Sequence, residues 1–200
     1  MREILAGIFT WPWFSQPHGY NFNGHFIRHA DGNLCIDPVE PSDEDLEELA
    51  SHGVARILLT NRNHSRAANK VRARTGGRTA IHTADALHAR SEGAELDDDL
   101  KPGDKVGPFV VVGVPGKSPG EVALQWPERK ILLVGDALVG DPPGRCKLLP
   151  EKVLDDLPRL RKSVRGLLAL DFDILLVGDG VPITQFAKER LRELVDTFPQ

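Results

Sequence analysis

Side chains that could do chemistry gather in four short polar clusters, and each cluster directly follows an apolar run. The clusters span 61–66, 115–120, 135–136 and 178–180. In sheets flanked by helices, ligands and catalytic groups collect at the carboxyl ends of strands, because exposed loops leave a rigid scaffold there. One such cluster would be an ordinary loop, whereas four in succession indicate a shared site.

The residue types in these clusters suit acid–base catalysis and the binding of anions. His64 could serve as a general base, and Lys117 or Arg66 could stabilise an oxyanion. Asp136 or Asp179 could orient either group. No single motif formed by these residues fixes a reaction.

The elements that must position the clusters can be predicted from hydrophobic patterns. Apolar runs predict buried strands at 54–60, 109–114, 131–134 and 174–177, each ending at a cluster. Further strands are predicted at 3–9, 24–28, 34–37, 79–82 and 122–126, and residues 97–107 are predicted to be a charged loop. A helix is predicted from an N-cap at Ser42 to His52, and a second follows the polar turn at 61–65 and runs to Arg74. Two further helices are predicted over 154–170 and 183–198. Strands that cluster early and later alternate with helices favour sheets with helices outside.

Composition favours one globular domain spanning 1–200. The chain has 200 residues, of which 40% are hydrophobic and 27% charged. The formal net charge is −4 and no basic block occurs, so we expect no nucleic-acid partner and no membrane surface. No apolar run approaches the roughly 20 residues of a membrane helix. We therefore expect a soluble, cytoplasmic protein in which Cys35 and Cys146 are reduced.

The four clusters, in order, resemble the four metal-binding motifs of the metallo-β-lactamase superfamily. Residues 60–66 stand where that family has Thr-His-x-His-x-Asp-His, and 116–120 match its Gly-His-Thr-Pro-Gly loop. Residues 135–136 match the Gly-Asp pair, and 178–180 match the Gly-His-Gly loop. The resemblance covers nearly the whole chain and implies an α/β (α+β) fold, a four-layer αββα sandwich with the site along one edge of the two sheets.

Most of the metal ligands that the resemblance implies have been replaced, although the scaffold residues match. Only Asp136 is retained. The replacements are Asn61 and Asn63 for two histidines, Ser65 for the aspartate that positions the attacking water, and Arg66, Lys117 and Asp179 for three further histidines. The chain is also similar to uncharacterised cyanobacterial-type proteins named as metal-dependent hydrolases, whose label implies no demonstrated reaction.

These replacements argue against a pair of zinc ions. Zinc needs imidazoles and carboxylates at about 2.0–2.2 Å, and cationic side chains at ~4 Å would repel a dication by several kcal/mol. We hypothesise that Arg66 and Lys117 supply the missing positive charge. They would then pair with Asp136 and Asp179, which would otherwise be buried anions without partners.

The cofactor remains unknown at this point, and a weakly bound single ion is the open alternative to no metal at all. Asp136 and Asp179, with Asn61 or Asn63, offer oxygen ligands that suit magnesium or manganese better than zinc. The two cationic side chains nearby count against even that ion.

Structural roles compete with each of these functional roles. His64 occupies a spacer position of its motif, so that its side chain could point away from the site. Asp136 could accept backbone hydrogen bonds, and Asp179 between two glycines could be a turn residue. Asn61 and Asn63 could cap the helix that follows them, and the lysine of the second cluster could be solvated.

The sequence therefore predicts a metallo-β-lactamase-like hydrolase with a degenerate metal site. Its substrate would be a small ester-like or phosphorylated molecule whose anionic group Arg66 and Lys117 hold. The predicted catalytic residues are Asp136, His64 and Lys117, and the predicted ligand-binding residues are Asn61, Asn63, Arg66, Lys117 and Asp179. The alternative is a non-catalytic module that binds an anionic ligand or a partner protein, and a homodimer is left open.

Overall fold

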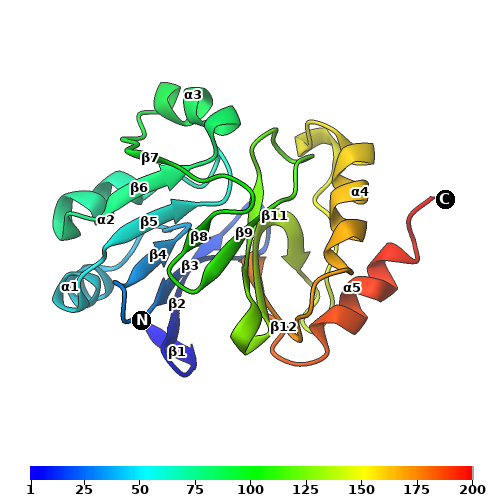
Figure 1. Cartoon of the computed structure of the whole chain (residues 1–200), viewed down its shortest axis with the longest axis horizontal. Coiled ribbons are helices and arrows are strands. Elements are labelled where there is room, and N and C mark those ends of the chain that lie inside the picture. Colours follow the sequence, from blue (N-terminus) through cyan, green and yellow to red (C-terminus); the bar gives the residue numbers. More distant parts are fainter. Residues whose placement is uncertain (200) are drawn as a thin grey trace. The chain divides into compact units, whose positions relative to one another are not determined.

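A computed structural model describes residues 1–199 of the chain, which fold as two compact units (Figure 1). Unit 1 comprises Met1–Leu100, and unit 2 begins at Lys101. The single domain expected over 1–200 stays a prediction, and the units are described one at a time. Within the described residues, no helix combines the length and the apolar character needed to cross a bilayer.

Unit 1 is a mixed sheet packed with three helices. In the order of the sheet its strands are β7 (Asp98–Asp99), β6 (Arg78–Ile81), β5 (Arg56–Leu59), β4 (Leu34–Ile36), β3 (Tyr20–Ile27), β2 (Ile8–Ser15) and β1 (Arg2–Leu5). β4 to β7 pair in parallel, and parallel pairs need crossovers, which α1 (Asp43–His52), α2 (Ala68–Thr75) and α3 (Thr83–Ser91) supply. Apolar side chains of these strands and helices, including Phe26, Leu49 and Ile57, form the core of the unit.

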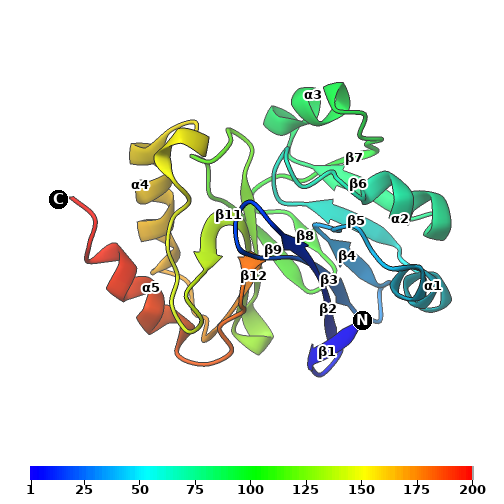
Figure 2. The same ribbon diagram turned by 180° about the vertical axis from the view of Figure 1, so that it is seen from behind.

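Unit 2 likewise contains β-strands in mixed orientation, with helices and a core of its own. Its strands follow the order β12 (Ile174–Gly180), β11 (Ile131–Gly140), β10 (Val122–Trp126), β9 (Phe109–Gly113) and β8 (Lys105–Val106). β11 and β12 are parallel and the other neighbours antiparallel. The helices α4 (Leu157–Leu167) and α5 (Ala187–Val195) lie side by side and bury Leu160, Val164 and Leu191 in that core (Figure 2). Short 3₁₀ turns occur at Pro127–Arg129 and Glu151–Val153.

Several predicted elements differ from the observed ones at identifiable residues. The strand expected at 3–9 is two strands, because Gly7 adopts a φ of 73° and turns the chain between β1 and β2. The helix α3 was not predicted, and the residues expected to form a loop at 97–107 include the short strands β7 and β8. The predicted N-cap at Ser42 is confirmed, since its side chain accepts a hydrogen bond from Asp45 N.

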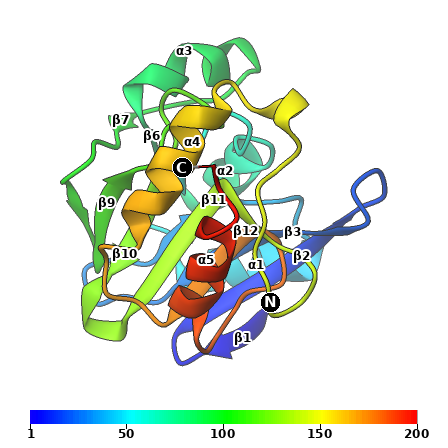
Figure 3. The same cartoon turned by 90° about the vertical axis from the view of Figure 1, so that its right-hand side faces the viewer.

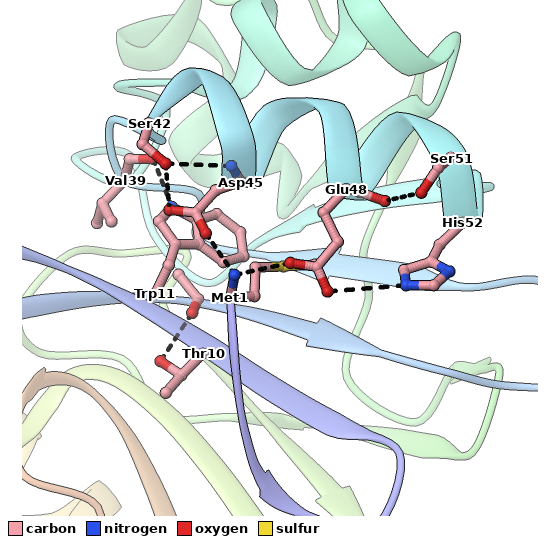
Figure 4. A network of polar contacts seen from close by, with 10 residues as sticks. Met1, Thr10, Trp11, Val39, Ser42, Asp45, Glu48, Ser51 and His52 are labelled. Atoms are coloured by element: carbon pink, nitrogen blue, oxygen red, sulfur yellow. Dashed lines mark hydrogen bonds and ion pairs between the residues drawn. The ribbon is translucent and has the colours of Figure 1, made fainter.

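The hairpin of β2 and β3 is the longest antiparallel pair of unit 1 and projects as a ribbon (Figure 3). Polar contacts join Trp11 of this hairpin to the segment before α1, and join Met1 to α1 itself (Figure 4). Trp11 Nε1 donates to the Val39 carbonyl oxygen at 3.0 Å, and the Met1 amino group donates to Asp45 and Glu48 of α1. Trp11 is buried, whereas Trp13 nearer the turn is 44% exposed.

Candidate active site

A buried aspartate–histidine pair lies at the carboxyl ends of β4 and β5 in unit 1. His64 Nδ1 lies 2.9 Å from Asp37 Oδ2, and the two side chains are 2% and 1% exposed. Thr60 donates to the same carboxylate twice, from its backbone N at 2.8 Å and from its hydroxyl at 2.6 Å. With Asp37 as acceptor, Nδ1 carries the imidazole proton, so the carboxylate fixes both the ring orientation and the tautomer.

Two strand ends place this pair, because β4 and β5 are parallel neighbours and stop at the same edge. Asp37 follows β4 directly and adopts a φ of 48°, and its backbone N donates to Leu58 O. His64 belongs to the turn after β5, where its N donates to Asn61 O at 3.2 Å. The side chain of His64 is turned to Asp37 and away from solvent.

The two asparagines that replace histidine ligands shape this turn. Asn61 is buried, and its side-chain oxygen accepts a hydrogen bond from Asn63 N at 2.9 Å. This contact leaves Asn61 presenting its amide Nδ2, a buried donor without a hydrogen-bond partner among the described residues. Asn63 itself is exposed. Asn61 therefore shapes the turn, but the expectation that the two asparagines cap the next helix was wrong, because the N-cap of α2 is Ala67 and receives no side-chain hydrogen bond. The predicted role of Asn61 as a ligand-binding residue stays a prediction.

Arg66 lies on an aromatic ring. Its guanidinium carbon is 4.5 Å from the centroid of the Phe22 ring of β3, and the side chain is exposed. Within unit 1, Arg66 therefore makes a cation–π contact, and its hypothesised pairing with an aspartate stays a prediction.

An ion pair between Lys117 and Asp136 is the main polar feature of unit 2. Lys117 Nζ lies 3.2 Å from Asp136 Oδ2, and each side chain is only 9% exposed. This is the pairing that the replaced motifs led us to expect. A buried charge pair of this kind persists because removing either partner would strand the other charge.

Residues of β11, β12 and α4 hold these groups in place. The loop before Lys117 is fixed to α4, because Asp156 N donates to Gly116 O at 2.8 Å and Ser163 Oγ donates to Pro115 O at 2.7 Å. Asp136 and Asp179 were expected in loops after their strands, and this expectation was wrong. Both lie inside longer strands, at or beside an irregularity in the β11–β12 register between Val134 and Val139.

Neither cysteine is a plausible nucleophile. Both are free thiols and buried. Burial, with a smaller effect of the Asp37 charge, raises the pKa of Cys35 far above its usual range. Burial likewise raises the pKa of Cys146 to about 11. Because the thiolate is the reactive form, both groups stay inert at neutral pH.

The residues at the replaced ligand positions do not fit a pair of zinc ions. Asn61 offers only a neutral amide, whose oxygen already accepts a hydrogen bond from Asn63 N and whose buried Nδ2 is a donor. At the second motif an ammonium group stands 3.2 Å from the one retained carboxylate. A donor and a cation cannot ligate zinc, which takes thiolates, neutral imidazoles and carboxylates.

Sequence reasoning missed Asp37 and Asp85 as members of the site. Asp37 was seen only as part of a strand segment, although an aspartate directly after an apolar run is the signal used for the other clusters. Asp85 of α3 accepts a hydrogen bond from Arg62 N at 3.0 Å and so anchors the turn that carries His64. Since α3 was not predicted, nothing in the sequence pointed to this contact.

Comparison with known proteins places these observations in a family. The model of the metallo-β-lactamase superfamily matches residues 4–198. A hydroxyacylglutathione hydrolase of Fuscovulum blasticum is 31% identical over 133 residues, which are 62% of this chain and about half (51%) of that protein.

Solved structures agree with this match at the level of the fold. A metallo-β-lactamase from Pontibacter korlensis superposes with a TM-score of 0.79 at 15% identity, covering 98% of both chains. The protein TTHA1623, solved in a di-iron-bound form, has a TM-score of 0.68 at 24% identity and covers 90% of this chain and 96% of its own. The α/β fold predicted from the motifs is therefore confirmed, and the chain belongs to the metallo-β-lactamase superfamily.

Proposed function

We propose that this member of a hydrolase family cleaves a small anionic ester, thioester or phosphoester by acid–base catalysis from its own side chains, without a zinc pair. The observation that carries the proposal is the buried pair of Asp37 and His64. Burying a carboxylate and an imidazole costs free energy unless they hydrogen-bond to each other. An imidazole held in one tautomer is the arrangement that a general base requires.

His64 is the base in this mechanism and Asp37 is its positioning residue. Asp37 accepts the Nδ1 proton, so Nε2 takes the proton from water. The hydroxyl oxygen adds to the carbonyl carbon or to phosphorus while the bond to the leaving group breaks. The leaving atom then receives the proton that His64 holds, which restores the neutral imidazole.

Lys117, paired with Asp136, supplies the positive charge that metal ions would supply if the usual ligands were present. The ammonium group of Lys117 stabilises the oxyanion that develops on the substrate, and Asp136, 3.2 Å away, orients it. The basis for assigning His64 and Lys117 to one reaction is the order of the four motifs along the chain. Asp179 and the two asparagines complete the proposed set of ligand-binding residues.

The name of the curated relative suggests which substrates to test first. Hydroxyacylglutathione is a thioester with carboxylate groups, so it combines a cleavable acyl bond with negative charge. A screen should therefore include thioesters beside phosphoesters and lactams.

A non-catalytic module remains the second candidate. The observation that favours it is that Lys117 already pairs with Asp136, so both charges are compensated before any ligand arrives. Such a module would bind an anionic molecule or a partner protein, and anions would raise its thermal stability without turnover.

Kinetics on the purified full chain distinguish the two candidates. We expect turnover that EDTA leaves unchanged and that His64→Gln lowers by roughly 10²–10⁴-fold in kcat/KM. Asp37→Asn should lower kcat by a smaller factor and change the pH profile, because it alters the tautomer. His29→Gln, a partly exposed histidine of the same unit, is the matched control. Two tightly bound zinc ions per chain, or full activity in His64→Gln, would contradict the mechanism.

A further inference from the structure

A cavity of about 380 Å³ in unit 1 has a lining made only of polar side chains. Arg62, Asn63, Ser65, Arg66, His88 and Glu92 line it. Four of these residues come from the turn after β5 and two from the end of α3. Because no apolar side chain lines the cavity, its occupant should be a charged or strongly polar group.

Arg66 contacts an aromatic ring, whereas the basic residues of the neighbouring α2 and β6 contact carboxylates. The basic side chains of α2 and β6 each form an ion pair with a carboxylate, namely Lys70 with Glu40, Arg72 with Asp97, Arg74 with Glu47 and Arg78 with Asp98. Arg66 instead lies over the Phe22 ring, and within the described part of unit 1 it forms no ion pair with a carboxylate. Stacking occupies the face of a guanidinium and leaves the in-plane N–H donors open.

The rest of the lining adds donors and a single acid. Ser65 contributes a hydroxyl, and His88 contributes an exposed imidazole on α3. Arg62 is held in place through its backbone, whose N donates to Asp85. Among the described residues that line the cavity, Glu92 is the one carboxylate.

We propose that this cavity is the subsite for the anionic group of the substrate, of the class of a phosphate or a carboxylate, and that Arg66 binds it through two parallel hydrogen bonds. The assignment to a substrate rests on the proposed function, whereas the binding of an anion does not. Phe22 is then a positioning residue, because its ring holds the guanidinium of a side chain that lines the cavity.

Calorimetric titration of the full chain with inorganic phosphate at low ionic strength tests the subsite. We expect Arg66→Gln to weaken phosphate binding by about tenfold or more, since it removes charge-assisted hydrogen bonds. Arg66→Lys should recover only part of the loss, because lysine keeps the charge but not the planar pair of donors. Glu92→Gln should tighten binding by about twofold to threefold by removing the opposing charge.

Arg90→Gln is the matched control, since it makes the same charge change on α3 outside the cavity lining. Equal phosphate affinity in the Arg66 and Arg90 variants would overturn the subsite, as would wild-type protein that binds no phosphate. Phosphate binding that depends on Arg66, combined with no turnover in any substrate class, would leave the subsite standing and refute the hydrolase. Turnover by the parent chain, combined with unchanged phosphate binding in Arg66→Gln, would support the hydrolase and refute the subsite.

Discussion

At the scale of single residues, this chain keeps the charge of its site within buried pairs of side chains. Lys117 and Asp136 lie 3.2 Å apart and His64 and Asp37 lie 2.9 Å apart, with all four side chains at least nine-tenths buried. Each group in such a pair is oriented by its partner, and loss of either partner would leave the other buried without its contact. The pairs therefore contribute stability and reactivity together.

Replacement of Lys117 by methionine should destabilise the protein strongly. The change strands the Asp136 carboxylate in a buried place, and breaking a buried pair costs about 3–5 kcal/mol. Urea unfolding at neutral pH measures this loss. The double variant Lys117→Met with Asp136→Asn should recover much of it, because no unpaired charge remains.

The exposed pair of Lys130 and Asp171 in the same unit is the control for that measurement. Its side chains are 62% and 73% exposed, so Lys130→Met should cost at most about 1 kcal/mol. If the two lysine variants lose equal stability, the Lys117 pair is not the buried structural contact that the distance indicates.

The sequence predicted one of these pairs and not the other, for a physical reason. Lys117 stands at a replaced ligand position and Asp136 at the retained one, so their opposite charges predicted an ion pair. Asp37 and His64 are 27 positions apart in the sequence, and the parallel pairing of β4 with β5 brings them together. Propensity and motif order carry no information on such a long-range contact.

At the scale of elements, the longer strands β11 and β12 decide where the acidic groups lie. The hydrophobic runs ended at Val134 and Val177, whereas the strands continue to Gly140 and Gly180 through polar and small residues. Those continuations were taken for loops because Gly and Asp are rare in strands. The missed helix α3 has a comparable cause, since its N-cap is the side chain of His82, which accepts from Ala84 N. Histidine is not among the preferred capping residues.

Gly180→Ala should lower stability, because two strands meet there without room for a side chain. Gly180 has a φ of 89°, and a Cβ would lie 2.4 Å from the carbonyl oxygen of Gly140 on the neighbouring strand. Strained backbone of this kind costs about 1–3 kcal/mol, and the clash adds to that. Thermal unfolding of the variant measures the effect.

Gly166→Ala in the same unit should raise stability, in contrast to Gly180→Ala. Gly166 lies within α4, and a Cβ there would meet nothing within 4 Å. Alanine is the better helix former by about 0.8–1 kcal/mol, so this variant should be more stable than the parent chain. A Gly180→Ala variant as stable as the parent would show that β11 and β12 separate more easily than their close contact implies.

At the scale of the whole molecule, charge is nearly balanced and much of it is paired. The chain has 25 basic and 29 acidic residues, and the surface of unit 1 carries ion pairs that join α2 and β6 to the segment at Asp97 and Asp98. Carboxylates that are paired in the folded chain bind protons less readily than in the unfolded chain. Stability therefore falls as acid protonates them.

Asp97 provides a test of this acid dependence with a definite sign. The hydrogen bond from Arg72, then the one from Thr79 N, lowers the pKa of Asp97 to about 2. A lowered folded-state pKa contributes stability that is fully present above the unfolded value of about 3.9 and disappears as the pH falls through about 2. Urea midpoints between pH 4 and pH 2 should therefore fall less steeply for Asp97→Asn than for the parent chain. Equal slopes of urea midpoint against pH for Asp97→Asn and the parent chain would mean that the Arg72 contact does not lower the pKa of Asp97 in solution.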